Sequence, residues 1–198
     1  MQQGAADRPD LDWNTGEHGA LPITHSGQLD TPMPAANLEK LFHDTLRDVY
    51  YAERKALQAL RKHARSAQHT ELKQAFEQHR EETEGQIERL QRVFETIGKR
   101  PQGKTCAAMD GLVEEGEEIM EEYKGSPAAD AGLLAAAQAI EHYEITRYGT
   151  LAAWARQLGN QEAEQLLRQT LAEEEKTDRL LTEMAESVIN AAAEQPAA

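Results

Sequence analysis

Cysteine, aromatic residues and long apolar runs are all scarce in this sequence. It has one cysteine, Cys106, and aromatic residues make up 5% of its 198 residues. A single cysteine excludes an intramolecular disulfide and favours a reducing compartment. No stretch approaches the roughly 18 to 20 apolar residues that a membrane-spanning helix needs. The opening MQQGAADRPD lacks the basic and apolar regions of a secretory signal, so we expect a cytoplasmic protein with no membrane partner.

Basic residues are also few relative to acidic ones. The chain has 21 Lys and Arg against 35 Asp and Glu, which gives a formal net charge of −14. A surface this acidic repels phosphate backbones, so we expect no nucleic-acid partner. The same charge attracts cations, although acidity alone also serves solubility. Charge therefore leaves both a cation-binding and a merely solubilising interpretation open.

The composition changes sharply near residue 37. Residues 1–36 are rich in Gly, Pro, Asp, Gln and Thr and show no hydrophobic periodicity, which predicts a disordered or loosely ordered N-terminal tail. Helix-forming residues dominate from there on, so we expect one domain over residues 37–190. Residues 191–198 are expected to form a flexible C-terminal tail.

Capping residues divide this domain into helices. Asn37 and Asn160 are good N-caps, Gly98 and Gly159 are typical helix stops, and Ser126-Pro127 has the pattern of a helix start. Helices are predicted over about 37–67, 70–97, 106–123, 126–158 and 160–190, and no strand-like alternation is present. The fold class is therefore all-α.

The connections between these helices predict their topology. Only a few residues join the first long helix to the second, or the third long helix to the last, which makes each pair an antiparallel hairpin. About 30 residues separate the two hairpins and carry the short helix. This arrangement is typical of a ferritin-like antiparallel four-helix bundle with a long crossover, here bearing a short fifth helix.

Metal-binding residue types interrupt the apolar seam of every long helix near its middle. The interrupting residues are Glu53 in the first helix, His79 and Glu82 in the second, Glu141 and Glu144 in the third, and Glu174 and Asp178 in the last. Glu175 competes with Glu174, because Glu175 and Asp178 have nearly the ExxH spacing of di-iron bundles. In an antiparallel bundle these interruptions converge at one level.

Several buried carboxylates at one level need a compensating positive charge. No lysine lies on these seams, and Arg89 is expected to point outward. Oxygen ligands with few imidazoles suit iron or manganese better than zinc or copper. Any one glutamate can fall on a seam by chance in so acidic a chain, but a coincidence in four helices favours a dinuclear metal site.

Five motifs along these helices resemble those of the YciF-like stress-response proteins of the ferritin-like (rubrerythrin-like) superfamily. They are YYAERKALQAL (50–60), HREETEGQIERL (79–90), CAAMDGLVEEG (106–116), AIEHYEITRYGTL (139–151) and LAEEEKTDRLL (171–181). The resemblance implies a five-helix fold, a homodimer and a dinuclear site. It also implies the ligands Glu53, Glu82, Glu141 and Glu144, together with Glu174 or Glu175 and Asp178. This chain departs from the superfamily in placing His79 before Glu82 and Asp178 where a histidine is usual.

The resulting functional hypothesis is a di-iron carboxylate protein of the stress response. It binds two iron ions and reacts with O2 or H2O2 in the manner of a ferroxidase or peroxidase, and, without a CxxC pair, it depends on a separate electron donor. Two alternatives stay open: a manganese catalase-like enzyme using the same site, and a non-catalytic dimeric bundle.

Overall fold

The chain folds into a bundle of long helices, and a computed structural model describes residues 36–194. The helices are α1 (Leu38–Ser66), α2 (Thr70–Thr96), α3 (Ala107–Glu122), α4 (Ala129–Gln157) and α5 (Gln161–Met184), followed by a π-helix (Ala185–Ile189) and the short α6 (Asn190–Ala193). No strand occurs within residues 36–194. The all-α prediction is confirmed.

The predicted capping residues begin and end most of these helices. The side chain of Asn37 accepts a hydrogen bond from the backbone N–H of Lys40, and Asn160 caps α5 in the same way. Gly98 and Gly159 follow α2 and α4 with φ of 65° and 74°, a left-handed conformation that glycine adopts without strain. These turns set the short α4–α5 connection and the start of the crossover.

Two predicted boundaries differ from the structure. Ser126-Pro127 forms a turn rather than a helix start, and α4 begins at Ala129. Asp130 in the first turn of α4 joins this helix to the connection between α1 and α2. Its carboxylate accepts hydrogen bonds from the backbone N–H groups of Gln68 and His69 at 2.9 and 2.7 Å. Helical structure also continues to Ala193, beyond the predicted end at residue 190. Residues 1–35 of the predicted N-terminal tail and residues 195–198 of the predicted C-terminal tail lie outside the described residues.

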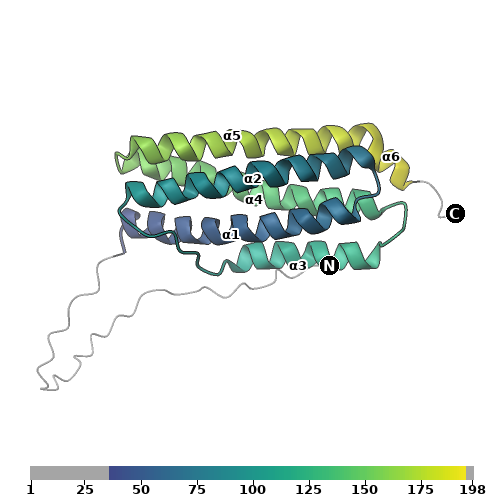
Figure 1. The fold of residues 1–198 in the computed structure, drawn as a ribbon, viewed down its shortest axis with the longest axis horizontal. Helices are drawn as coiled ribbons and strands as arrows, with labels where there is room; N and C mark the ends of the chain where they lie inside the picture. Colours follow the sequence, from purple (N-terminus) through teal and green to yellow (C-terminus); the bar gives the residue numbers. More distant parts are fainter. Residues whose placement is uncertain (1–35, 195–198) are drawn as a thin grey trace, which may run out of the picture. The chain divides into compact units, whose positions relative to one another are not determined.

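The four long helices form the bundle, and α3 packs on its outside. Figure 1 shows α1 and α2 as one hairpin beside the hairpin of α4 and α5. In this bundle α1 contacts α2 and α4, α5 contacts α2 and α4, and α3 contacts α1 and α4. The crossover therefore returns the chain along one edge of the bundle, as the loop lengths predict.

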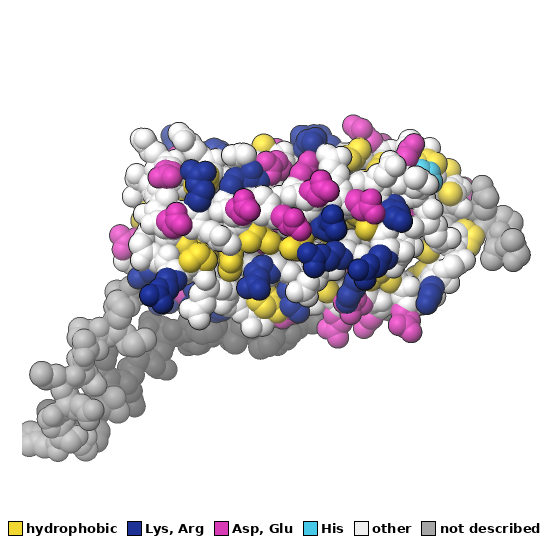
Figure 2. Space-filling model, in the orientation of Figure 1, with side chains coloured by type: hydrophobic (Ala, Val, Ile, Leu, Met, Phe, Trp, Pro, Cys, Tyr) yellow, Lys and Arg dark blue, Asp and Glu magenta, His cyan; other side chains and the backbone are white. Residues whose placement is uncertain are grey.

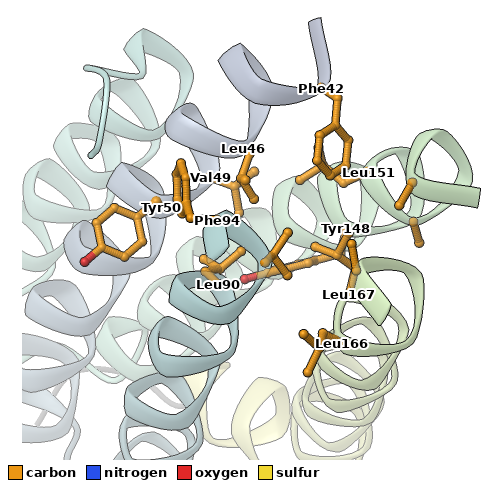
Figure 3. Close-up of a cluster of buried hydrophobic side chains, with 14 residues drawn as sticks. Phe42, Leu46, Val49, Tyr50, Leu90, Phe94, Tyr148, Leu151, Leu166 and Leu167 are labelled. Atoms are coloured by element: carbon orange, nitrogen blue, oxygen red, sulfur yellow. The ribbon is translucent and has the colours of Figure 1, made fainter. Parts of the chain in front are cut away.

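The interior contains apolar clusters at two levels of the bundle. The first, here called the Phe94 cluster, includes Phe42, Leu46, Val49, Leu90, Phe94, Leu151 and Leu167 (Figure 3). The second, the Phe76 cluster, includes Leu60, Leu72, Phe76, Leu133, Leu134 and Leu181. In each helix the residues between these clusters are the seam positions at which the sequence carries polar side chains.

Small side chains let α3 approach the bundle closely. Ala52, Ala56 and Ala59 of α1 are buried together with Met109 of α3 and Ile140 of α4. Alanines on one face of α1 bring the helix backbones near each other and leave Met109 to fill the gap. As a result α3 covers the side of the bundle nearest the middle of α1.

Charged residues of both signs are interspersed on the surface. Figure 2 shows acidic and basic side chains side by side over α1, α2 and α5, and pairs such as Arg61 with Glu84 at 3.7 Å and Arg92 with Glu162 at 3.6 Å join them. In the described part of the chain, no helix combines the length and the apolar character needed to cross a membrane.

Candidate metal centre

Five ligand-type side chains meet in the middle of the bundle. They are Glu53 of α1, His79 of α2, Glu141 and Glu144 of α4, and Glu174 of α5. None is more than 4% exposed. Each occupies a seam position that would otherwise carry an apolar residue, so the helical periodicity that builds the core also directs these groups inward.

His79 lies close to two of these carboxylates. Its Nε2 is 3.0 Å from Oε1 of Glu141 and 3.6 Å from Oε2 of Glu174. One ligand atom from each of His79, Glu141, Glu144 and Glu174 lies within 4.8 Å of the others. Four groups from three helices thus converge on a space of the size that a coordinated metal ion occupies.

Tyr148 closes the site on the side of the Phe94 cluster. Its ring is fully buried, and its hydroxyl donates a hydrogen bond to Oε1 of Glu53. Figure 3 shows the tyrosine lying among the leucines of that cluster. Tyr148 follows Glu144 by one helical turn, so both side chains project from the same face of α4. The phenol therefore holds Glu53 in place from across the bundle.

Carboxylate oxygens at the site lack the donors that buried acceptors require. No hydrogen-bond partner is found among the described residues for Oε2 of Glu53, Oε2 of Glu141, Oε1 of Glu144 and both oxygens of Glu174. Leaving one buried acceptor unsatisfied costs about 1 to 3 kcal/mol. Divalent or trivalent cations are suited to such a set of oxygens, so the residues present fit a metal centre.

The site is partly neutralised when no metal is bound. Burial raises the pKa of Glu53 to about 7, with Glu141 adding to the rise and Tyr148 and His79 opposing it. Burial also raises the pKa values of Glu144 and Glu174 well above the usual range, with neighbouring carboxylates adding to the effect. Burial lowers the pKa of His79, but the charge and hydrogen bond of Glu141 outweigh it and bring the pKa to about 10. Protons therefore occupy the metal-free cluster at neutral pH.

Three predicted ligands lie outside this buried cluster. The side chain of Glu82 is 25% exposed and lies 3.5 Å from Nζ of Lys176, at the edge of the inward face, about 60° around α2 from His79. Glu175 is exposed because it follows the inward-facing Glu174 by about 100°. Asp178 accepts a hydrogen bond from Gln138 and lies 3.3 Å from Nε2 of His142. The structure thus places Glu174, and not Glu175, inside the bundle.

Glu82 nevertheless remains near the site. Its Oε2 is 3.8 Å from Nδ1 of His79, and the pKa of Glu82 is lowered to about 2, chiefly by His79. Thr177 Oγ1 lies closer to the same ring nitrogen, at 3.3 Å. Glu82 and Thr177 together orient the imidazole whose other nitrogen faces the carboxylates.

Arg89, which the sequence predicts to point outward, is partly buried between α2 and α5. Its guanidinium donates to both oxygens of Glu173 and to Oγ1 of Thr170, and Glu173 also accepts from Nε2 of Gln86. Gln86 and Thr170 are fully buried beside the cluster. The sequence contains one indication of these buried polar contacts: Gln86 and Thr170 lie at seam positions, where apolar residues are usual.

The fold and this buried carboxylate cluster define a ferritin-like helical bundle. Residues 37–194 match a family described as a domain of unknown function, DUF892. The chain is 45% identical over 166 residues to the protein YciF of Escherichia coli (strain K12). The aligned residues make up 83% of this chain and 100% of that protein. The chain therefore belongs to the DUF892 family and is YciF-like.

Solved structures give the same result for the fold. The crystal structure of the Escherichia coli stress protein YciF matches with a TM-score of 0.75 and 45% identity, over 78% of this chain and 98% of that one. The structure of YcfI from Rhodopseudomonas palustris matches with a TM-score of 0.73 and 42% identity, over 76% and 96% of the two chains. The bundle is thus shared with these proteins over nearly their whole length.

Proposed function

We propose that this protein is a dinuclear carboxylate metal protein that binds iron and reacts with O2 or H2O2 during stress. The observation that carries the proposal is the set of buried carboxylate oxygens without donors at the middle of the bundle. Its donors are four carboxylates and one imidazole, a set that suits iron or manganese. The stress context comes from the likeness to the Escherichia coli stress protein YciF.

Glu53, His79, Glu141, Glu144 and Glu174 would hold the metal pair, which would supply the electrons for reducing the oxidant. Before loading, the protons on His79, Glu144 and Glu174 must leave, so that metal binding and proton release are coupled. Tyr148 keeps Glu53 oriented towards the cluster. The Phe94 and Phe76 clusters on either side restrict the access of bulk water to the carboxylates.

An anaerobic Fe(II) titration tests this proposal directly. We expect saturation near two ions per chain, accompanied by proton release in weakly buffered solution at pH 7. Glu144→Gln, which removes a buried oxygen ligand, should lower the stoichiometry or weaken binding by at least tenfold. Glu118→Gln, on the exposed face of α3, is the matched control and should bind as wild type does. A titration that saturates at zero would overturn the proposal.

Manganese is the alternative metal for the same donors, because the oxygen-rich set suits it equally. In that case the protein would be catalase-like and would disproportionate H2O2. Elemental analysis of protein purified from its native host distinguishes the two metals. Catalase assays on the iron-loaded and manganese-loaded forms then assign the reaction.

A non-catalytic bundle is the second candidate, and one observation favours it. The protonated His79 lies between Glu141 and Glu174, so the buried cluster can close on itself without a metal. The suggested role of YcfI from Rhodopseudomonas palustris is structural. Protein that contains no stoichiometric metal after iron-replete anaerobic purification, and takes up none afterwards, would support this candidate.

A further inference from the structure

A second buried histidine lies beside the carboxylate cluster. His63 of α1 is 2% exposed and packs its ring against Phe76, with the ring centroids 5.4 Å apart. It follows Ala59 by one helical turn and Ala56 by two. Burial lowers the pKa of His63 to about 4, so the ring is neutral at pH 7 and one of its nitrogens carries a proton. Nδ1 of this ring has no hydrogen-bond partner in residues 36–194.

A small cavity lies between His63 and the candidate ligands. It is lined by His63, His79 and Glu141 together with the apolar residues Ala56, Ala59, Leu60, Ala137 and Ile140. Its volume of about 10 Å3 gives room for one water molecule, which needs at least two polar partners to be stably bound. Two such atoms are available, since Oε2 of Glu141 is also buried and without a partner among the described residues.

We propose that one buried water molecule occupies this cavity and joins Nδ1 of His63 to Oε2 of Glu141. The water would satisfy both atoms at once, and His63 would become a positioning residue for Glu141. Oε1 of Glu141 faces Nε2 of His79 at 3.0 Å, so the two oxygens of this carboxylate would be held from opposite ends. This role rests on the proposed function, in which Glu141 is a metal ligand.

The outer end of the imidazole faces α3. A Cβ added at Gly116 would lie 3.8 Å from Nε2 of His63 and 3.4 Å from Cβ of Ala136, both ordinary contact distances. Gly116→Ala therefore fits without displacing its neighbours and alters the surroundings of Nε2 while leaving the cavity unchanged. Lys62 and Glu117 on the same side form an ion pair with each other at the surface. Gly116→Ala is thus a matched control for changes at Nδ1.

The test uses full-length protein in three variants: His63→Leu, His63→Gln and Gly116→Ala. Co(II) is the probe, because its visible absorption bands report ligand geometry and its affinity can be measured without turnover. Loss of a group that orients a metal ligand typically weakens binding by about 10 to 100-fold. We expect His63→Leu to weaken Co(II) binding by at least tenfold and to shift the bands. His63→Gln, which can still hydrogen-bond to the water, should restore both, and Gly116→Ala should match wild type.

A high-resolution crystal structure of the wild-type protein provides the second arm. We expect density for one ordered water within hydrogen-bond distance of His63 Nδ1 and Glu141 Oε2. Absence of that density would overturn the inference, as would a His63→Leu protein with wild-type Co(II) affinity and spectrum. Failure of wild-type protein to bind any Co(II) or Fe(II) would instead refute the proposed function, and the water density would still decide whether His63 and Glu141 are bridged.

Discussion

Replacing Glu53 with glutamine should stabilise the metal-free protein at alkaline pH and leave it unchanged at acid pH. Glutamine has nearly the same shape as glutamate, and its carbonyl oxygen can still accept the hydrogen bond from Tyr148. What the change removes is the ability to ionise in a fully buried position. The stability difference between the two proteins should therefore depend on pH.

The magnitude follows from the pKa of Glu53, which burial raises from 4.5 to about 7. Each unit of difference between the folded and unfolded states corresponds to about 1.4 kcal/mol in the free energy of unfolding. Because the folded state holds this proton more tightly, the wild-type protein loses stability as pH rises from about 4.5 to about 7. The full loss of about 3 kcal/mol is present above that range, and the Glu53→Gln variant should escape it.

The measurement is urea unfolding of the metal-free proteins at about pH 5 and pH 8.5, in chelator. At pH 8.5 the variant should be more stable than wild type by up to about 3 kcal/mol, and near pH 5, just above the unfolded pKa of 4.5, the difference should shrink to about 1 kcal/mol or less. Glu118→Gln on exposed α3 should show no pH-dependent difference. If Glu53→Gln is less stable than wild type at both pH values, or if the difference does not change with pH, the buried titration assigned to Glu53 is wrong.

Four further outcomes are expected. Metal-free wild-type protein should lose thermal stability from pH 6.5 to 10, because the raised pKa of His79 contributes stability that is complete below 6.5 and is lost as pH rises through about 10. Calorimetry should show that the thermal stability depends less on pH once metal is bound. Tyr148→Phe should destabilise the protein by about 1 to 3 kcal/mol in urea unfolding, since it leaves an oxygen of Glu53 without its donor; an unchanged midpoint would refute this. Deletion of residues 1–35, which are poor in apolar residues, should preserve helical circular dichroism and metal stoichiometry. Sedimentation should show a homodimer, and a monomer at all concentrations would contradict that expectation.

The sequence determined the helices themselves, because their signals are local. Asn37, Gly98 and Asn160 act on backbone groups only a few residues away, and the structure places them at the helix ends that they predict. Ser126-Pro127 was misleading for the same reason. The structure begins α4 at Ala129 instead, and the carboxylate of the adjacent Asp130 accepts hydrogen bonds from the backbone of residues 68 and 69, far away in the sequence.

The sequence also located the level of the candidate site, because helical periodicity alone brings Glu53, Glu141, Glu144 and Glu174 onto inward faces. Tertiary structure decided which neighbours on each helix join them. Adjacent residues such as Glu174 and Glu175 differ by only about 100° of helix rotation, and the packing of α5 against α2 and α4 determines which one is buried. The partial burial of Arg89 against Glu173, the hydrogen bond of Tyr148 to Glu53 and the cavity beside His63 likewise depend on contacts between helices. Such contacts leave no local pattern in the sequence, because each joins residues that only the folded bundle brings together.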